Sequence, residues 1–497
     1  MTNTPSSPSS DQHEERLAGA FRSSMFWNIA NMGVSQIITT AVFIYLTYKL
    51  DAAVFGIFAL GVVVIDYFYF QARSASTDAI LQRRQFDDKA LDSVFWTSGL
   101  VILIVMIFCF FSGSALAAST NEPTLKYVLP ALGLTLLPVP FSLSPGAVLM
   151  RDHDFKGIAL RNILAAIAGC GAAIATVLSS YPEWALVAQR GMNALVSSVF
   201  LMLRARWWPG LNLSSTYAKG FLVDSGRIFA AQAIATSYMR ILDVVVGISI
   251  GAAAVGYMRV AARFVDAIYG AFAAPIGTLW VVLLSEGTQT KEQLSTMYLR
   301  LTQMSSLICL PVFAGIALTS PDLVAFALDD SYGPVAPILM VLGIAGLFSP
   351  IVYFRNAALT AIKKLNLLLV YSICDLFVVA GAALALMYLN PNVSLIVCSL
   401  VILNSVRLFQ TTPILLKEMS TKLSSLIQCM MPAYIAVAIM ALVVLGLSPF
   451  VAELPAGVRL LIKAISGAAA YFGYLLLLHK DWSATAISML WKRKAAA

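Results

Sequence analysis

Arginine and aspartate side chains recur within two neighbouring stretches of the sequence that are otherwise apolar. The first stretch contains Arg240 and Asp243, and the next contains Arg259, Arg263 and Asp266. Spacings of three and four residues place the charges of each stretch on one face of a helix. Because guanidinium groups recognise phosphates and carboxylates through several donors at once, these two faces predict a binding site for an anion.

Further charged and polar residues lie within other apolar stretches. Inside a bilayer an ionised side chain costs about 2.5 to 3.5 kcal/mol even on the most lenient scale, so each should face protein or water. The residues expected to line a substrate cavity are Arg240, Arg259, Arg263, Arg190, Arg407 and Gln232. The residues expected to couple an ion or to pair with the arginines are Asp66, Asp243, Asp266 and Asp375.

Some of these side chains have a purely structural interpretation. Arg355 lies near a cytoplasmic helix end and Arg259 near an external one, and both are long enough to snorkel to the membrane surface. Asp243 would serve equally well to neutralise Arg240 as an intramembrane ion pair. For Arg240, Arg263 and Arg407, which lie deeper, the position in the sequence favours a cavity.

The elements that carry these residues are apolar segments of about 20 residues, the length that a helix needs to cross a bilayer. Of the 497 residues, 59% are hydrophobic and 12% are charged, against about 25% charged in an average soluble domain. Successive segments run from Met25–Leu50 to Gly457–Leu478. We therefore expect an all-α polytopic membrane protein with about fourteen transmembrane helices.

Basic residues predict the orientation of these helices, because cytoplasmic loops are enriched in Lys and Arg. One set of alternate connections holds nearly all the basic residues, whereas the other set holds only Lys49 and Lys126. The second set also carries Asp51, Glu122, Glu183, Asp322, Asp329, Asp330 and Glu453. We therefore expect both termini in the cytoplasm, and we attribute the net charge of +8 to membrane topology rather than to nucleic-acid binding.

The connections divide the chain into predicted parts. A basic linker that contains Trp207 and Trp208 separates two groups of six helices. The expected parts are a disordered cytoplasmic tail (1–24), an N-terminal lobe (25–203), a cytoplasmic linker (204–220), a C-terminal lobe (221–416), two extra helices (417–479) and a cytoplasmic tail (480–497). Prolines are expected to bend several spans, most of all the fourth, which contains Pro130, Pro138, Pro140 and Pro145.

Neither a metal centre nor a cofactor is expected. The six cysteines lie inside apolar runs without a CxxC spacing, and the three histidines are scattered. Such cysteines are typical of small buried hydrophobic residues.

Four segments resemble the Wzx-type polysaccharide flippases, which form the polysaccharide transporter branch of the multidrug/oligosaccharidyl-lipid/polysaccharide exporter superfamily. They are DAILQRRQFDDKALDSVFW (Asp78–Trp96), PFSLSPGAVLMRDHDFKGIALRN (Pro140–Asn162), WALVAQRGMNALVSSVFLMLRARWWPGL (Trp184–Leu211) and VGYMRVAARFVDAIYGAFAAPIGTLWVVLLSE (Val255–Glu286). The resemblance covers most of residues 20–420 and includes no catalytic signature.

The resemblance implies a MATE-like fold of two six-helix lobes followed by two extra helices. It implies a flippase, not an enzyme, that moves undecaprenyl-diphosphate-linked oligosaccharides across the bacterial inner membrane by alternating access. The implied partners are this lipid-linked oligosaccharide, the bilayer, and the polysaccharide polymerase and export machinery. The cationic cavity of the relatives corresponds here to Arg240, Arg259 and Arg263.

Two other functions are weighed against this one. A cation-coupled multidrug exporter of the same superfamily usually has twelve spans and an anionic site, whereas the cavity expected here is positive. A membrane polysaccharide polymerase or glycosyltransferase typically has a large external loop or acidic metal-binding residues in an early loop, and neither is found in this sequence.

Overall fold

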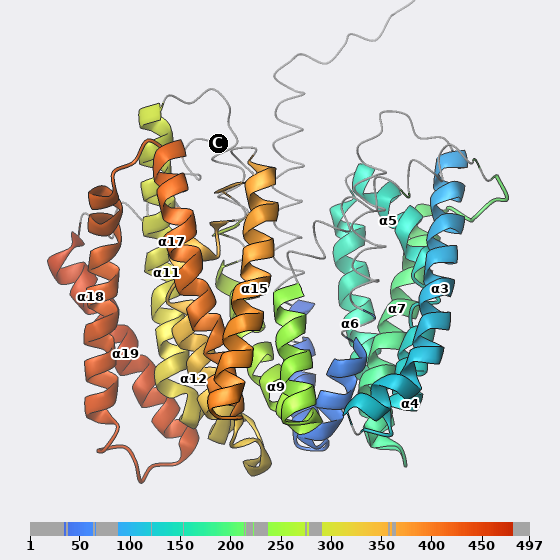
Figure 1. The fold of residues 1–497 in the computed structure, drawn as a ribbon, viewed down its shortest axis with the longest axis horizontal. Coiled ribbons are helices and arrows are strands. Elements are labelled where there is room, and N and C mark those ends of the chain that lie inside the picture. The colour runs from blue at the N-terminus through green and yellow to red at the C-terminus, as the bar shows by residue number, and fades with distance from the viewer. Residues whose placement is uncertain are drawn as a thin grey trace, which may run out of the picture. The chain divides into compact units, whose positions relative to one another are not determined.

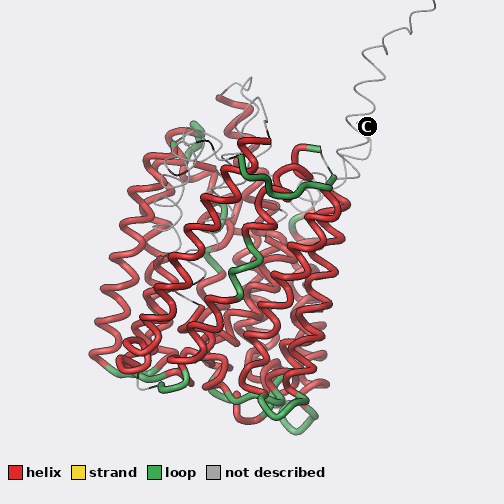
Figure 2. Tube along the Cα trace, turned by 90° about the vertical axis from the view of Figure 1, so that its right-hand side faces the viewer, coloured by secondary structure: helices red, strands yellow, loops and turns green. Residues whose placement is uncertain are grey.

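The computed structural model describes residues 34–35, 38–62, 65, 88–120, 122–152, 154–212, 214, 222, 237–273, 276–277, 291–355, 358–359 and 364–480. Within these ranges all regular secondary structure is helical, as the tube in Figure 2 shows. Eight of the described helices are long and apolar enough to cross a bilayer, and four shorter apolar helices accompany them. The predicted class of an all-α polytopic membrane protein is confirmed, and these helices are compatible with about fourteen spans.

The eight long helices are all rich in apolar residues. They are α3 (Asp88–Thr120), α6 (Phe155–Val177), α7 (Ala185–Ala205), α11 (Lys291–Ala327), α15 (Leu365–Leu389), α17 (Ser399–Glu418), α18 (Leu423–Leu447) and α19 (Ala456–Leu478). The shorter ones are Ile38–Thr47, Ala52–Val62, 237–249, α4 (Leu125–Leu134), α5 (Pro140–Arg151), α9 (Ala252–Ile268), α12 (Val335–Gly346), α13 (Ser349–Val352) and α16 (Val393–Val397). Single turns are η1 (Pro182–Trp184), η2 (Tyr269–Ala273) and η3 (Asp330–Tyr332).

The described helices belong to two compact units. The first unit comprises residues 1–42, 64–113 and 127–229, and the second comprises 43–63, 114–126 and 230–497. Figure 1 labels α5, α6 and α7 in the first unit and α9, α11, α12, α15, α17, α18 and α19 in the second. Helix α3 belongs to the first unit up to Gly113, and α4 belongs to it from Tyr127 onward. The predicted lobe boundaries at 203 and 221 stay a prediction.

Prolines break the predicted fourth span into two helices. Helix α4 ends at Leu134 and α5 begins at Pro140, with turns between them. Proline lacks an amide hydrogen and clashes with the preceding turn, so a helix cannot pass through closely spaced prolines undisturbed. The carbonyl of Pro138 accepts a hydrogen bond of 2.6 Å from the Ser198 hydroxyl on α7. A neighbouring helix thus satisfies a backbone group that the break leaves exposed.

The segment after α7 is fastened to the start of α3. The Gly210 amide donates to Asp92 Oδ1 at 2.9 Å, and the Trp96 indole donates to the Gly210 carbonyl at 2.8 Å. The ring of Trp207 packs beside Phe95, with 6.0 Å between the ring centroids. This contact and the two hydrogen bonds fix the path of the chain where it leaves α7.

In the second unit, the helix Ala52–Val62 crosses α9 at very short range. A Cβ atom added to Gly56 would lie 1.6 Å from the Ala252 carbonyl oxygen, and one added to Gly256 would lie 1.9 Å from the Ala52 oxygen. Each helix therefore presents a pair of small residues four positions apart to the other. Small residues at this spacing let helix backbones approach closely in membranes. This crossing holds α9, and with it the charged face of α9, in place.

Helices α18 and α19 pack together against α11 through a core that includes Leu310, Ala436 and Tyr471. A charged group joins the same helices. Lys463 Nζ lies 2.6 Å from Asp322 Oδ2, and Arg459 Nε lies 2.8 Å from its Oδ1. The prediction that Asp322 lies in an external connection is wrong, because α11 continues to Ala327 with the carboxylate neutralised inside it.

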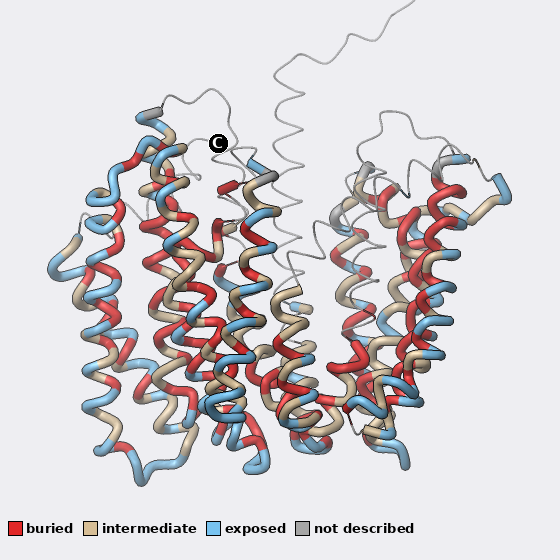
Figure 3. Tube along the Cα trace, in the orientation of Figure 1, coloured by how far each residue is buried: buried red, intermediate tan, exposed pale blue. Residues whose placement is uncertain are grey.

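Exposed residues recur along α3 and α18 in Figure 3, and large apolar side chains are among them. Phe111 on α3 is 72% exposed, and Leu442 on α18 is also 72% exposed. Helices of a soluble protein turn such side chains inward. These faces are therefore suited to contact with lipid.

Candidate functional site

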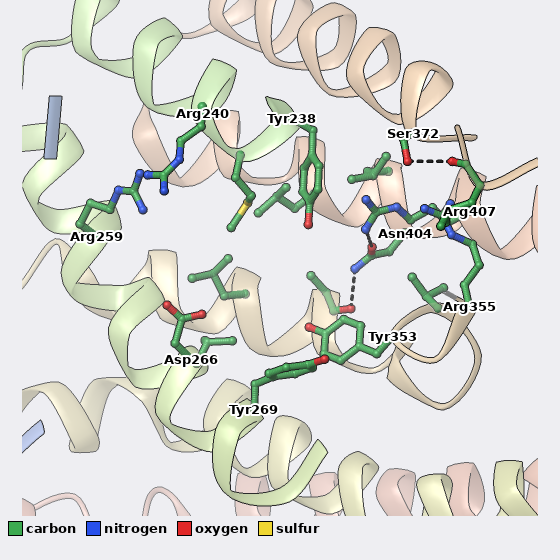
Figure 4. A pocket seen from close by; sticks show the side chains of 18 residues that line it. Tyr238, Arg240, Arg259, Asp266, Tyr269, Tyr353, Arg355, Ser372, Asn404 and Arg407 are labelled. Atoms are coloured by element: carbon green, nitrogen blue, oxygen red, sulfur yellow. Dashed lines mark hydrogen bonds between the residues drawn. The ribbon is translucent and has the colours of Figure 1, made fainter. Parts of the chain in front are cut away.

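A cavity of about 700 Å³ lies within the second unit. Its walls come from the helix over 237–249 and from α9, α12, α13, α15 and α17 (Figure 4). Ligand pockets usually measure about 300 to 1,000 Å³ and combine apolar walls with a few polar groups. The polar lining here consists of Tyr238, Arg240, Arg259, Asp266, Tyr269, Tyr353, Arg355, Ser372, Asn404 and Arg407.

A turn at a glycine brings together the residues of the first charged group that lines this cavity. The helix over 237–249 ends just before Gly251, which has φ +116° and precedes α9. Only glycine adopts this backbone conformation without strain. The two helices can therefore fold back on each other, so that Asp243 and Arg259 come into contact although 16 residues separate them.

Arg240 and Arg259 share a single carboxylate. An Nη2–Oδ2 contact joins Arg259 to Asp243, and Arg240 Nη1 lies 3.9 Å from the same oxygen. The Asp243 side chain is 2% exposed, whereas those of Arg240 and Arg259 are 25% and 29% exposed. The carboxylate thus lies behind the two guanidinium groups, which face the cavity side by side in Figure 4. In this group, the Arg240 end, two arginines thus pair with one carboxylate.

A second group on the other side of the cavity has the same composition. Arg355 Nη2 lies 2.7 Å from Asp375 Oδ2, and Arg407 Nη2 lies 3.1 Å from the same oxygen. All three side chains are buried or nearly so, with Asp375 2%, Arg355 3% and Arg407 11% exposed. This group, the Arg407 end, also holds two guanidinium groups against one carboxylate and keeps one positive charge.

Neighbouring side chains fix the orientation of Arg407. Its guanidinium lies over the ring of Tyr238, 4.6 Å from the centroid, which is a favourable cation–π geometry. Its Nη1 lies 3.4 Å from the Asn404 side-chain oxygen, and the Asn404 amide donates to the Ala345 carbonyl at 2.9 Å. Tyr238 and Asn404 therefore hold the guanidinium in one place instead of leaving it free to move.

A π-helical turn shapes the floor of the cavity. Residues Tyr269–Ala273 continue α9 as a π-helix, a rare element that often occurs at functional sites. Tyr269 packs edge-on against Tyr353, with 5.5 Å between the centroids. The two rings form an aromatic surface below Tyr238 in Figure 4.

The cavity is suited to bind an anion. Four arginines and one aspartate are the charged residues of its lining. Charges interact more strongly in a protein interior than in water, and arginine is the side chain best suited to phosphate and carboxylate oxygens. Among the described residues, no three His, Cys, Asp or Glu side chains are placed to hold a metal ion.

The structure brings several of the predicted site residues together. Arg240, Arg259, Arg407 and Asp266 all line the one cavity. Asp243 and Asp375 do not line it but pair with its arginines. Asp243 thus neutralises arginine as the structural interpretation proposed, in a pair that also forms the wall of the cavity. The function of all these residues stays a prediction.

Other predicted site residues lie elsewhere. Arg263 is not in the lining, and its guanidinium lies 5.8 Å from the centroid of the Phe43 ring. Arg190 is on α7 in the first unit. Gln232 and Asp66 lie outside the described residues.

Several residues of the cavity lining were not predicted from the sequence, or were predicted to lie elsewhere. The interpretation that Arg355 snorkels to the surface is wrong, because its side chain is buried against Asp375. The sequence analysis singled out neither Tyr238 nor Asn404. The spacing of Asn404, three residues before Arg407, gives a usable signal because the two share a helical face. Tyr238 lies two residues before Arg240, a spacing that gives no such signal.

Comparison with known proteins agrees with this architecture. The family model described as polysaccharide biosynthesis protein matches residues 50–337, which is more than half of the chain. The chain belongs to this family. The segment of this chain that matches the family model includes Arg240, Arg259 and Asp266 but ends before Asp375 and Arg407.

A curated relative is the lipopolysaccharide biosynthesis protein WzxC of Escherichia coli (strain K12). It is 21% identical over 305 residues, which span 60% of this chain and 61% of WzxC. The alignment thus covers less than two thirds of the length of that relative. Together with the family match, it confirms the resemblance to Wzx-type proteins.

Two solved structures show the same fold. The lipid II flippase MurJ, in an inward closed conformation, superposes with a TM-score of 0.74 at 14% identity over 92% of this chain and 99% of MurJ. An inward-facing multidrug resistance transporter of the MATE family gives 0.55 at 18% identity over 80% of this chain and 94% of its own. The predicted MATE-like fold is confirmed. The named structures are a flippase and a transporter, in agreement with the prediction that this family member is not an enzyme.

Proposed function

We propose that this chain is a flippase that moves undecaprenyl-diphosphate-linked oligosaccharide repeat units across the bacterial inner membrane for polysaccharide biosynthesis and export. The observation that carries the proposal is an arginine-lined cavity among helices that are apolar enough to span a membrane. The family match and the names of WzxC and MurJ support it.

The cavity fits the chemistry of such a cargo. A lipid-linked oligosaccharide has an apolar tail, a diphosphate with several strong acceptor oxygens, and a hydroxyl-rich saccharide. The tail can stay in lipid beside the apolar outer faces of the helices. The diphosphate requires cations, and the Arg240 end offers two guanidinium groups that are about a quarter exposed to the cavity. We propose that Arg240 and Arg259 bind the diphosphate.

The remaining candidates are assigned by position. Asp266 lines the cavity on the same helix as Arg259 and lies below it in Figure 4, and we propose it as the group that couples transport to an ion. Arg263, Arg190, Gln232 and Asp66 stay candidates for contacts with cargo or ion during the transport cycle. Transport itself would follow alternating access, in which two lobes (25–203 and 221–416) move about the linker 204–220.

We propose an inner-membrane location with both termini in the cytoplasm, and partners that include the polysaccharide polymerase and export machinery. A clean deletion of the gene tests the function in its host. The expected result is loss of the extracellular polymer and accumulation of lipid-linked repeat units in the cytoplasmic leaflet, both restored by the wild-type gene. Normal polymer export in the deletion strain would contradict the proposal.

An overexpressing strain separates this function from drug export. A cation-coupled multidrug exporter would lower susceptibility to cationic drugs. Because the lining of the cavity is positively charged, we expect the susceptibility to such drugs to stay unchanged.

A further inference from the structure

The two charged ends of the cavity are separate binding positions. Arg240 and Arg259 come from the hairpin of the helix 237–249 and α9, whereas Arg407 belongs to α17 and Arg355 follows α13. In Figure 4 the ring of Tyr238 lies between the two groups. Each group has its own carboxylate and one more arginine than that carboxylate can balance. A cargo that neutralises both must therefore carry two anionic groups, one on each side of Tyr238.

At the Arg407 end, one guanidinium is available and the other is not. Arg355 makes two contacts with Asp375, at 2.7 and 3.4 Å, and is 3% exposed. Arg407 has one contact of 3.1 Å with Asp375, a long hydrogen bond of 3.4 Å to Asn404 and the cation–π contact with Tyr238. Its Nε is buried and has no hydrogen-bond partner among the described residues. A buried donor without an acceptor is costly, so the described residues leave the guanidinium of Arg407 less fully bonded than that of Arg355.

The surroundings of Arg407 fit a sugar. The rings of Tyr238 and Tyr353 and the side chains of Asn404 and Ser372 line the cavity next to it. Aromatic rings can cover the apolar face of a pyranose, and amide and hydroxyl groups can bind its hydroxyls. A planar guanidinium matches a planar carboxylate through two parallel hydrogen bonds. The one unbalanced positive charge also equals the charge of one carboxylate.

We propose that the Arg407 end is a second anion subsite that binds a carboxylate carried by the saccharide, so that the preferred cargo is an acidic oligosaccharide. The proposal rests on the proposed function, because it assigns the second subsite to the same cargo whose diphosphate binds at Arg240 and Arg259. It divides the cavity into a diphosphate position and a position that selects the sugar.

Two cargoes that differ in one group test the proposal. Both are undecaprenyl-diphosphate-linked oligosaccharides of the same length, one with a hexuronic acid and the other with the corresponding neutral hexose. Translocation of each is measured in vesicles reconstituted with the full-length protein. Four proteins are compared: the wild type, Arg407→Gln, Arg240→Gln and the control Lys364→Gln, whose side chain pairs with Glu418 at the surface.

We expect the wild type to move the acidic cargo about tenfold to a hundredfold faster than the neutral one, the range of one hydrogen bond to a charged group. Arg407→Gln should remove this preference by slowing the acidic cargo far more than the neutral one, and thermal unfolding of the purified variant checks that it is folded. Arg240→Gln should slow both cargoes by a similar factor. Lys364→Gln should behave as the wild type does.

Other outcomes overturn the proposal. Equal rates for both cargoes with the wild type would show that no carboxylate is selected. If Arg407→Gln slowed the translocation of both cargoes by the same factor, both ends of the cavity would bind one diphosphate. If the wild type translocated neither cargo, the proposed function itself would fail. An Arg407→Lys variant adds a further check, because it keeps the charge but not the planar donors and should retain only part of the preference.

Discussion

Arg407 and Asp375 form an ion pair with an Nη2–Oδ2 distance of 3.1 Å that joins α17 to α15 at the cavity wall. The same oxygen accepts from Arg355 at 2.7 Å. Asp375 is thus the centre of a buried group that has more positive than negative charge. Asp243 and Asp322 are centres of two further groups with the same arrangement of one carboxylate and two cations.

Removal of the Asp375 charge should destabilise the protein more than removal of either partner. Asp375→Asn leaves Arg355 and Arg407 buried without a counter-charge, and breaking such a pair from one side costs about 3 to 5 kcal/mol. Arg407→Gln leaves Asp375 paired with Arg355, so its cost should be smaller. Thermal unfolding of the purified variants measures the difference. Equal stability of Asp375→Asn and the wild type would show that the ion pairs contribute nothing.

The charged group on α19 should hold the last two helices against α11. Asp322→Asn leaves Lys463 and Arg459 without their carboxylate, so we expect a loss of several kcal/mol by the same reasoning. Lys463→Met leaves Asp322 paired with Arg459 and should cost about 1.5 to 3 kcal/mol, the typical contribution of one hydrogen bond to a charged group. Limited proteolysis of the connection between α17 and α18 reports whether the helices detach. If proteolysis cut this connection no faster in Asp322→Asn than in the wild type, the account would be contradicted.

The crossing of Ala52–Val62 and α9 should not tolerate a larger residue. In Gly256→Ala the new methyl group would meet the Ala52 carbonyl oxygen at 1.9 Å, so the backbones must separate. Overpacking of this kind costs about 1 to 3 kcal/mol, and the displacement of α9 should also slow transport. Gly381→Ala on α15 is the matched control, because nothing lies within 4 Å of its new methyl group. Similar melting temperatures for the two variants would refute the close crossing.

Stability at acidic pH should depend on Asp154, which caps the start of α6. Burial raises the pKa of Asp154, but hydrogen bonds from Arg204 and the Gly157 amide, with the charges of Arg204 and Lys156, outweigh it and leave the pKa below its ordinary value. A lowered folded-state pKa stabilises the protein above the unfolded-state pKa, and this contribution is lost as the pH falls through the folded-state value.

The comparison of Asp154→Asn with the wild type measures this contribution. The variant should be less stable at neutral pH, and the difference should shrink below about pH 4, where the wild-type carboxyl begins to protonate. A difference in melting temperature that does not change between neutral and acidic pH would show that the Asp154 charge has no part in it.

The fold could be predicted from the sequence because charges are rare in long apolar segments. That contrast located the membrane helices and also Arg240, Arg259 and Arg407, which line the cavity. Helical spacing was a weaker guide to where each side chain on a helix ends. Arg263 follows Arg259 by four residues and shares its face, yet only Arg259 lines the cavity, while Arg263 lies over Phe43. A helical face spans a wide arc, and the neighbours decide where a long side chain ends.

Pairings between distant helices could not be predicted. Arg355, Asp375 and Arg407 come from three parts of the chain, so nothing in their local spacing indicates that they meet. Arg355 lies near the end of an apolar segment, which favours a surface position until a buried partner is known. Asp322 was misplaced for the same reason, because only its contacts with Lys463 and Arg459 make a buried position favourable.

Translocation of a lipid-linked oligosaccharide by reconstituted vesicles tests the central claim most directly. Purified protein is incorporated into vesicles with a fluorescent undecaprenyl-diphosphate-linked acidic oligosaccharide, and its movement to the opposite leaflet is followed by quenching from outside. We predict rapid translocation by the wild type and a reduction of about tenfold or more in Arg240→Gln and Arg259→Gln, since each loses a charged donor to the diphosphate. A wild-type rate no higher than that of protein-free vesicles would contradict the account.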